Sequence, residues 1–242
     1  PAAAAAAPAE VEYVDEKVAH VRTVIGKAMA RSLAEIPQLT HMLSADVTSL
    51  VAYRESIKNA PESMHMPKIS YNDMIMYAVS RVLLNYRELN ANTIDAKTMR
   101  FFTHVHLGMA VDTPRGLLVP TVFNADTKSL AQIAEEDKML AEQARSGSIN
   151  PDLLTGASFT VSNLGAYGVE YYTPVINVPQ TGILGIGGIT DRIKVVNGEV
   201  VPYKAMGLSL TYDHAALDGG EATNFLRDVK VALENFPALL SM

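Results

Sequence analysis

Apolar residues recur at intervals of three and four positions in several parts of the chain, the spacing that places side chains on one face of a helix. The first helix is predicted over residues 15–36 and ends before Pro37. Its apolar face includes Val21, Ile25 and Leu33. Further helices are predicted over residues 48–58, 128–146 and 220–235.

The strongest helical signal covers residues 70–86. Ser70 is followed three positions later by Asp73, a pair that resembles a capping box and predicts where this helix begins. The apolar residues behind this start form one stripe that we expect to be buried: Met74, Ile75, Ala78, Val79, Val82 and Leu83.

Alternating apolar residues and short apolar runs bounded by turn residues predict the strands. They cover residues 38–47, 103–111, 117–123, 158–162, 183–189, 192–196 and 200–212. Asn197-Gly198 predicts a tight hairpin between the last two. Helices and strands interleave, but neighbouring strands within 103–123 and 192–212 are expected to be antiparallel. The expected class is therefore α/β with a mixed sheet.

The length of 242 residues fits one α/β domain plus a tail better than two domains. Residues 1–9 are seven alanines and two prolines, a composition typical of semi-rigid linkers that tether another domain, although a ragged terminus is the alternative. We expect a linker tail at 1–14 and one domain at 15–242. The first residue is Pro1 and not a methionine, which indicates a piece of a longer protein.

Charge and composition exclude several classes of function. Twenty Lys and Arg against 26 Asp and Glu give a formal charge of −6, which excludes a generally basic nucleic-acid surface but not a local pocket for a phosphorylated ligand. The absence of cysteine excludes disulfides, thiolate metal sites and cysteine nucleophiles. No apolar stretch is long enough for a membrane helix. We expect a soluble protein without nucleic-acid or membrane partners.

Histidines are the first candidates for chemistry. His104 and His106 stand two apart on a predicted strand, so their side chains share a face. That spacing suits a metal, but no cysteine or nearby carboxylate completes a ligand set, so no metal site is predicted and a polar sheet face is expected. Three further histidines have no companions in sequence and are predicted to be surface or packing residues: His20, His41 and His65.

Common nucleotide and hydrolase signatures are missing. The chain has neither a Gly-x-Ser-x-Gly elbow nor a Walker loop. The glycine-rich residues 185–188 lack the third glycine of a dinucleotide fingerprint. They are better interpreted as a strand that another backbone or a ligand approaches closely.

The segment 212–220, Tyr-Asp-His-Ala-Ala-Leu-Asp-Gly-Gly, carries the most specific signal. His214 leaves a strand into a turn with two glycines, and Asp218 follows four positions later. Residues at such a rim of a rigid scaffold are often catalytic. By spacing alone, His214 is either a catalytic histidine or a turn residue hydrogen-bonded to Asp218.

Four segments together resemble a known family. Segment 212–220 resembles the His-x-x-x-Asp-Gly signature of dihydrolipoamide acyltransferases, the core components of 2-oxo acid dehydrogenase complexes, and of chloramphenicol acetyltransferases. Residues 158–165 resemble the family segment Phe-Thr-(Ile/Val)-Ser-Asn-Leu-Gly. Residues 175–187 resemble the family stretch from Ile-Ile-Asn-Pro-Pro-Gln to Ile-Leu-(Ala/Gly)-Val-Gly. Residues 110–120 are similar to the family segment Ala-Val-Asp-Thr-Pro-x-Gly-Leu-Val-Val-Pro. Ala215 and Val178 depart from the pattern, but neither position carries the chemistry.

The resemblance implies a chloramphenicol-acetyltransferase-like α/β fold, a mixed sheet flanked by helices that forms trimers, and acyl transfer between a dihydrolipoyl sulfur and coenzyme A. It implies that His214 is the general base and that Ser162 donates a hydrogen bond to the oxyanion. Asp218 either orients the histidine loop by an ion pair, for which Arg22 is the candidate partner, or helps to stabilise the intermediate. The first role is favoured, because buried carboxylates need a partner.

The resemblance also implies partners. We expect a homotrimer with His214 and Ser162 distant within one chain and close between chains, and assembly into a cubic or dodecahedral core. Other partners would be the dehydrogenase components and a lipoyl domain; the lipoyl group would sit on a separate domain that is not in this chain. Coenzyme A is the expected substrate, but no basic cluster identifies its contacts.

Ser162, where succinyl-transferring members tend to have threonine, favours acetyl from pyruvate or acetoin, with branched-chain and succinyl groups left open. The cytoplasm is the expected location, or the mitochondrial matrix in a eukaryote. The alternatives are a free-standing coenzyme A-dependent O-acetyltransferase and a non-catalytic scaffold subunit of the same complex.

Overall fold

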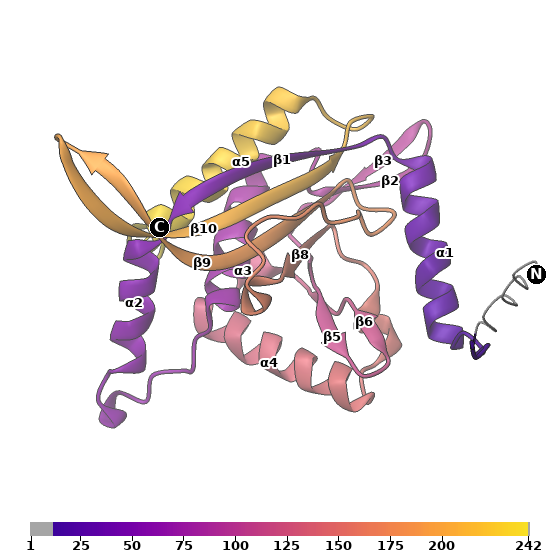
Figure 1. Ribbon diagram of the computed structural model, residues 1–242, viewed down its shortest axis with the longest axis horizontal. Coiled ribbons are helices and arrows are strands. Elements are labelled where there is room, and N and C mark those ends of the chain that lie inside the picture. The colour runs from indigo at the N-terminus through magenta and orange to yellow at the C-terminus, as the bar shows by residue number, and fades with distance from the viewer. Residues whose placement is uncertain (1–11, 242) are drawn as a thin grey trace, which may run out of the picture.

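A six-stranded mixed sheet forms the centre of the computed structural model, which describes residues 12–241 (Figure 1). The strand order is β1-β10-β9-β8-β4-β7. β1, β10 and β9 are antiparallel neighbours, whereas β8 runs parallel to both β9 and β4. The strands are β1 (Gln38–Asp46), β4 (Leu107–Met109), β7 (Thr121–Val122), β8 (Phe159–Asn163), β9 (Gly182–Val196) and β10 (Glu199–Asp213). The predicted α/β class with a mixed sheet is confirmed.

The strands predicted at 103–111 and 117–123 are wrong in detail. Residues 103–106 are irregular, because the N–H of Val105 donates to the Asp126 carboxylate and that of His106 to the Ser158 hydroxyl instead of to a neighbouring strand. Pro120, which has no N–H to donate, separates β6 from β7. Two small ribbons lie outside the main sheet: β2 (Ala91–Asp95) with β3 (Thr98–Phe101), and β5 (Val111–Thr113) with β6 (Gly116–Leu118).

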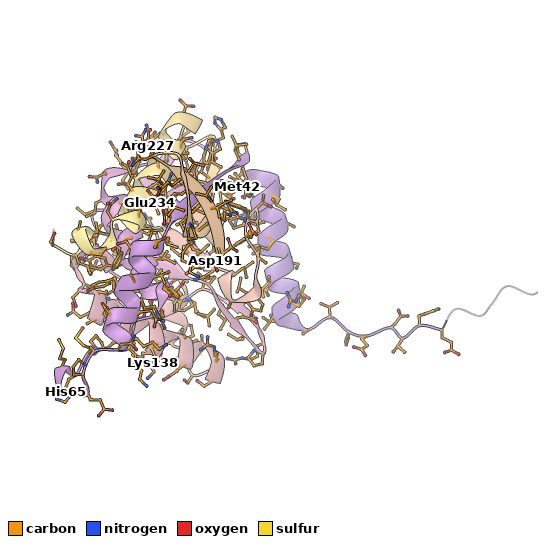
Figure 2. The ribbon with its side chains drawn as sticks, turned by 60° about the vertical axis from the view of Figure 1, so that its left-hand side comes forward. Met42, His65, Lys138, Asp191, Arg227 and Glu234 are labelled. Carbon is orange, nitrogen blue, oxygen red and sulfur yellow. The ribbon has the colours of Figure 1, made fainter. Side chains whose placement is uncertain are left out.

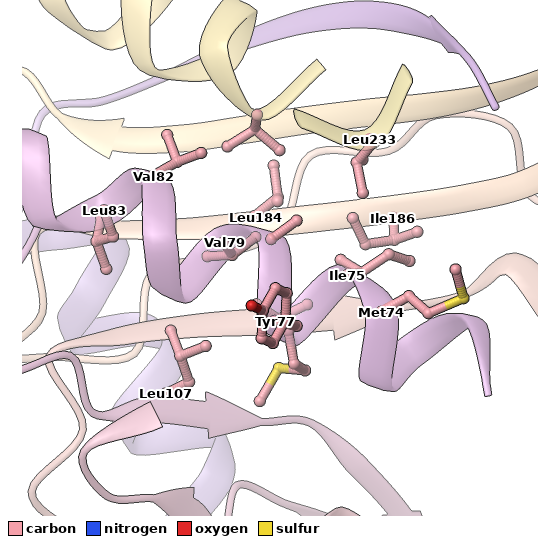
Figure 3. Packing of buried hydrophobic residues seen from close by; sticks show 14 of the residues in the cluster. Met74, Ile75, Tyr77, Val79, Val82, Leu83, Leu107, Leu184, Ile186 and Leu233 are labelled. Carbon is pink, nitrogen blue, oxygen red and sulfur yellow. The ribbon is translucent and has the colours of Figure 1, made fainter. Parts of the chain in front are cut away.

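The capping box predicted before α3 (Tyr71–Val82) is present. The Ser70 hydroxyl accepts from the N–H of Asp73, and the Asp73 carboxylate accepts from the N–H of Ser70 at 2.6 Å. The apolar stripe of α3 is buried as predicted, and Figure 3 shows it packed toward Leu184 and Ile186 of β9. The helix ends at Val82 and continues as the 3₁₀ turn η2 (Leu83–Asn85).

Two more helices contact α3, namely α4 (Leu130–Ser146) and α5 (Gly219–Glu234). Both match the predicted segments to within two residues. The remaining helical elements are α2 (Thr48–Lys58), α6 (Phe236–Leu239), η1 (Glu62–Met64), η3 (Ala125–Thr127), η4 (Pro151–Leu154) and η5 (Gly165–Tyr167). Within residues 12–241, no helix combines the length and the apolar character that crossing a bilayer requires.

The first helix, α1 (His20–Glu35), begins later than predicted and stands at the edge of the fold (Figure 1). Ser32 is the only residue of α1 that is buried within the chain, whereas Val21 is 40% and Leu33 61% exposed. The apolar face that the sequence indicates is therefore left largely uncovered. Residues 12–19 run away from the body of the fold without helix or strand (Figure 2). The predicted linker at 1–14 lies mostly outside the described residues.

Candidate active site

His214 is the residue at which the chain leaves the sheet. β10 ends at Asp213, and the N–H of His214 donates to the carbonyl of Pro37 with an N···O distance of 3.0 Å. The Asp213 carboxylate closes the turn by accepting from the N–H of Ala215 at 2.9 Å. The imidazole is exposed, and its ring centroid lies 5.6 Å from that of Tyr212. The backbone of His214 is thus fixed while its ring remains open to a substrate.

Asp218 immediately precedes α5 and is exposed. Its side chain makes no hydrogen bond to the helix N-terminus, and within the described chain none to His214, so the alternative of a turn histidine bonded to Asp218 is wrong for the single chain. Its influence on the loop is electrostatic. Burial, and after it the Asp218 carboxylate, raises the pKa of the Tyr212 phenol.

The ion pair predicted between Asp218 and Arg22 is not formed within residues 12–241 of one chain. Arg22 lies near the start of α1, whereas the loop of His214 adjoins Pro37 beyond the end of that helix. About 20 Å of helix separates Arg22 from Pro37, since an α-helix rises about 1.5 Å per residue. This distance is too long for an ion pair.

Ser162 lies near the end of β8, in register with Gly185 of β9. Its carbonyl oxygen accepts a hydrogen bond of 2.6 Å from the Tyr172 hydroxyl. Its own side chain is half-buried and points to the same face of the sheet as the Tyr172 ring, because Ser162 is in register with Gly185. The hydroxyl of Ser162 is therefore presented on the face opposite α3.

His214 and Ser162 do not meet within one chain. Ser162 is in register with Gly185, which is in register with Ser209 of β10, and His214 lies five residues beyond Ser209. Two strand spacings of about 4.8 Å and five residues at about 3.3 Å place the two residues roughly 19 Å apart. The predicted separation within a chain agrees with this register.

Glycines on the face opposite α3 admit the segment that supports Ser162. A Cβ atom at Gly185 would lie 2.9 Å from Cζ of Tyr172, and one at Gly187 or Gly207 would lie 2.0 Å from the carbonyl oxygen of Glu170. The close backbone approach predicted for this glycine-rich strand is confirmed. Sequence alone did not identify Tyr172 as a site residue. The available signal was Gly185, because a glycine within a strand can leave room for a large neighbouring side chain.

A cleft of about 770 Å³ lies between α3, α4, η5 and the middle of β9. Asn163, the neighbour of Ser162, lines it, together with three basic side chains: Lys68, Lys138 and Arg145. Lys138 and Arg145 lie seven positions apart on α4, and Lys68 lies before α3, so these cations do not form a basic cluster in the sequence. The polar wall of the cleft also includes Asn72, Asp73 and Asp137, which the sequence did not predict as site residues.

The other histidines take structural positions. His41 packs between β10 and α5, where its imidazole nitrogens contact the Tyr212 hydroxyl at 3.3 Å and the Thr223 hydroxyl at 2.9 Å. His20 and His65 are exposed. All three agree with the predicted surface or packing roles.

The polar strand face predicted for His104 and His106 is not present, because neither residue lies on a strand. Nδ1 of His104 contacts the Asp126 carboxylate at 2.8 Å, and Nδ1 of His106 accepts from the N–H of Asn124 at 3.0 Å. Asp126 is thus a nearby carboxylate that sequence spacing did not indicate. Across residues 12–241, no group of three or more His, Cys, Asp or Glu side chains is arranged to hold a metal ion.

Comparison with known sequences gives consistent matches over the whole chain. Residues 10–241 match the family of 2-oxoacid dehydrogenases acyltransferase (catalytic domain). The chain is 40% identical over 244 residues to the dihydrolipoyllysine-residue acetyltransferase component of the pyruvate dehydrogenase complex of Bacillus subtilis (strain 168), a match that covers 100% of this chain and 54% of that protein. The corresponding component of the acetoin cleaving system of the same organism is 37% identical over 223 residues, which cover 92% of this chain and 56% of that protein. The chain spans about half the length of these curated relatives.

Solved structures agree with the sequence matches. A dihydrolipoamide acetyltransferase of Azotobacter vinelandii superposes with a TM-score of 0.88 at 33% identity, over 96% of this chain and 94% of that chain. The cubic core of a pyruvate dehydrogenase multienzyme complex gives the same values. A chloramphenicol acetyltransferase, at 12% identity and a TM-score of 0.55 over 92% of this chain and 99% of that chain, shares the fold. The chain therefore belongs to the 2-oxoacid dehydrogenase acyltransferase family and comprises that family's catalytic domain.

Proposed function

We propose that this chain transfers an acetyl group between a dihydrolipoyl thioester and the thiol of coenzyme A. One observation carries the proposal. The Azotobacter vinelandii enzyme has been studied for the roles of a serine, a histidine and an asparagine in its mechanism; the serine and histidine are 52 positions apart, and the histidine and asparagine four. Ser162, His214 and Asp218 have the same separations on the same fold.

His214 is the proposed general base. A thiol with a pKa of about 8.5 is mostly protonated at pH 7, and only its thiolate attacks efficiently. The imidazole takes the proton from coenzyme A as sulfur attacks the thioester carbonyl, and returns it to the departing dihydrolipoyl sulfur when the tetrahedral intermediate collapses. General-base catalysis of this kind contributes about 10²–10⁴ in rate. The exposure of the imidazole at the rim of the sheet supports this role.

Ser162 is the proposed oxyanion donor. Attack on the carbonyl moves negative charge onto its oxygen, and one positioned donor contributes about 10²–10³ in kcat. The Tyr172 hydroxyl holds the backbone of Ser162 in place, which supports this role. No covalent intermediate on the serine is required, because a thiolate attacks a thioester directly.

The complete site requires two subunits. Because Ser162 and His214 of one chain are roughly 19 Å apart by strand register, we propose that Ser162 works with His214 of the partner subunit in a homotrimer. Apolar surface that the chain leaves uncovered supports such an interface: Leu33 on α1 is 61% exposed, and Ile193 and Val195 on the β9–β10 hairpin are each 71% exposed. Assembly into a cubic core, with a lipoyl domain and dehydrogenase components as further partners, extends this proposal.

The cleft is the proposed binding site for coenzyme A. Its volume is about 770 Å³, and Lys68, Lys138 and Arg145 supply positive charge for phosphates. Asn163, the residue after Ser162 on β8, lines the inner end of the cleft. Asp218 is proposed to orient the loop of His214, without the Arg22 pair.

Acetyl is the proposed acyl group, since the matched Bacillus subtilis proteins are acetyltransferase components. These relatives are bacterial, which supports a cytoplasmic location. A free-standing O-acetyltransferase and a non-catalytic scaffold are the competing functions. Steady-state assays with acetyl-coenzyme A as donor, and with either dihydrolipoamide or chloramphenicol as acceptor, separate the first, with turnover expected only for dihydrolipoamide.

The His214→Ala variant distinguishes an acetyltransferase from a non-catalytic scaffold. The proposal expects kcat to fall about 10²–10⁴-fold, with His41→Ala on the neighbouring strand as a matched control of smaller effect. Unchanged acetyl transfer by His214→Ala would leave the scaffold function standing.

A further inference from the structure

Two carboxyl groups that the proposed reaction does not use face each other in the wall of the cleft. Asp73 belongs to the first turn of α3 and Asp137 to the middle of α4, and they are only 6% and 4% exposed. Oδ1 of Asp137 is buried with no hydrogen-bond partner. A buried carboxylate oxygen without a partner is strongly unfavourable, and so is a second negative charge beside it. One of the two carboxyl groups should therefore be protonated.

The surroundings place that proton on Asp137. The Asp73 carboxylate already accepts a 2.6 Å hydrogen bond from the N–H of Ser70 in the capping box, whereas Oδ1 of Asp137 has no partner. Burial, and after it the neighbouring Asp73, raises the pKa of Asp137 to about 8. The two carboxyl groups thus hold one proton between them at neutral pH.

A chain of side-chain amides connects Asp137 to the end of β8. The Asn72 amide donates to Oδ2 of Asp137 at 3.4 Å, and its oxygen accepts from the amide of Asn163 at 3.3 Å. The oxygen of Asn163 in turn accepts from the N–H of Gly165 at 2.9 Å. Asn163 directly follows Ser162, so the chain of amides ends one residue beyond the proposed oxyanion donor.

We propose that Asp137 is a positioning residue, which in its protonated form holds Asn72 against Asn163 and so fixes the inner end of the cleft. This inference rests on the proposed function, since it assigns the cleft to coenzyme A. Loss of the proton places two negative charges side by side, which separates α3 from α4 and releases the amide chain. Coenzyme A should then bind more weakly, although Asp137 belongs to neither reacting group.

Few other titratable groups lie near Asp73 and Asp137. Glu136 is the neighbour of Asp137 on α4 and forms an ion pair with Lys128. Those that line the remainder of the cleft are Lys68, Tyr71, Asp112, Lys138, Arg145 and Tyr167. The comparison of Asp137→Asn with the wild type at each pH cancels their contribution, because asparagine keeps the shape of the protonated carboxyl and cannot ionise.

Calorimetric titration of the full chain with desulfo-coenzyme A, which has no thiol to ionise, tests the positioning role. Between pH 7 and pH 9 the affinity of the wild type should fall roughly tenfold, since about one tenth of a group with a pKa of 8 is protonated at pH 9. Asp137→Asn should lose no more than about twofold over the same interval. Glu135→Gln, which removes an exposed carboxylate from the same helix, should behave as the wild type does. An equal fall in Asp137→Asn and the wild type would overturn the proposal.

Infrared spectroscopy and the Asp73→Asn variant test the shared proton independently of acetyl transfer. The infrared band of a protonated carboxyl should be present at pH 7, lost by pH 9 and missing from Asp137→Asn; its absence from the wild type at pH 7 would overturn the shared proton without any ligand. Asp73→Asn should shift the fall in affinity to lower pH, because the like charge is gone. Acetyl transfer by the wild type at pH 7 is measured separately. A wild type without acetyl transfer would contradict the proposed function, whereas the binding and infrared results of the variants test the role of Asp137.

Discussion

The hydroxyl of Tyr172 donates a 2.6 Å hydrogen bond to the carbonyl oxygen of Ser162. The ring reaches that oxygen because Gly185, in register with Ser162 on β9, has no side chain in the way. Burial raises the pKa of the Tyr172 phenol, so the hydroxyl keeps its proton and remains a donor. Tyr172 therefore holds the proposed oxyanion donor through its backbone carbonyl, on the same face of the sheet to which the Ser162 side chain points.

Tyr172→Phe should lower kcat about three- to tenfold while KM for coenzyme A changes little. The variant loses one hydrogen bond with a net contribution of about 0.5–1.5 kcal/mol, and Ser162 loses its alignment. Tyr203→Phe, on the outer half of β10, is a matched control. Steady-state kinetics of both variants measure the effect, and an unchanged kcat for Tyr172→Phe would show that the bond does not position Ser162.

Stability should depend on pH through Asp137. Its pKa is raised in the folded chain to about 8, whereas an unfolded aspartate has a pKa of about 3.9. Between these values the folded chain binds a proton that the unfolded chain does not, so the stabilising contribution is complete below about pH 4 and is lost as pH rises toward 8.

Asp137→Asn removes this dependence, so the melting temperature of the variant should rise relative to that of the wild type as pH increases from 5 to 8. Differential scanning calorimetry at several pH values measures the difference. A constant difference across that range would mean that Asp137 is ionised in the folded protein.

Asp218→Ala should slow turnover and also loosen the loop that carries His214. Hydrogen exchange at the amides of Ala215, Ala216 and Leu217 reports loop order, and steady-state kinetics report the rate. Asp218→Asn keeps an oxygen acceptor and matches the asparagine studied in the Azotobacter vinelandii enzyme, so most activity should remain. A variant Asp218→Ala with unchanged exchange and lost turnover would show that the side chain acts on the intermediate itself.

Local signals in the sequence predicted local structure well. The capping box of Ser70 and Asp73 depends on residues three positions apart, and it is present. The hairpin at Asn197-Gly198 is present as well, with both residues at positive φ. Where long-range contacts decide, prediction failed: His104 and His106 look like strand residues, yet the backbone around them bonds to Asp126 and Ser158 from distant parts of the chain.

The candidate site was predicted unevenly for the same reason. His214, Ser162 and Asp218 stand in motifs that sequence alone displays. Asp137 looks like part of the polar face of a surface helix, and only packing against Asp73 reveals it as a buried acid. Likewise, the apolar face of α1 is readable from its spacing, but the sequence cannot say that its own chain leaves that face uncovered.

If Ser162 of one subunit works with His214 of another, mixing variants that each lack one of these groups should restore activity. Ser162→Ala and His214→Ala should each be nearly inactive alone, since each lacks one group. When the two are unfolded together, refolded and shown by mass spectrometry to share particles, about a quarter of the subunit interfaces pair an intact serine with an intact histidine. We predict that acetyl transfer returns to about a quarter of the wild-type rate. Mixed particles that remain as inactive as the separate variants would contradict a site shared between subunits.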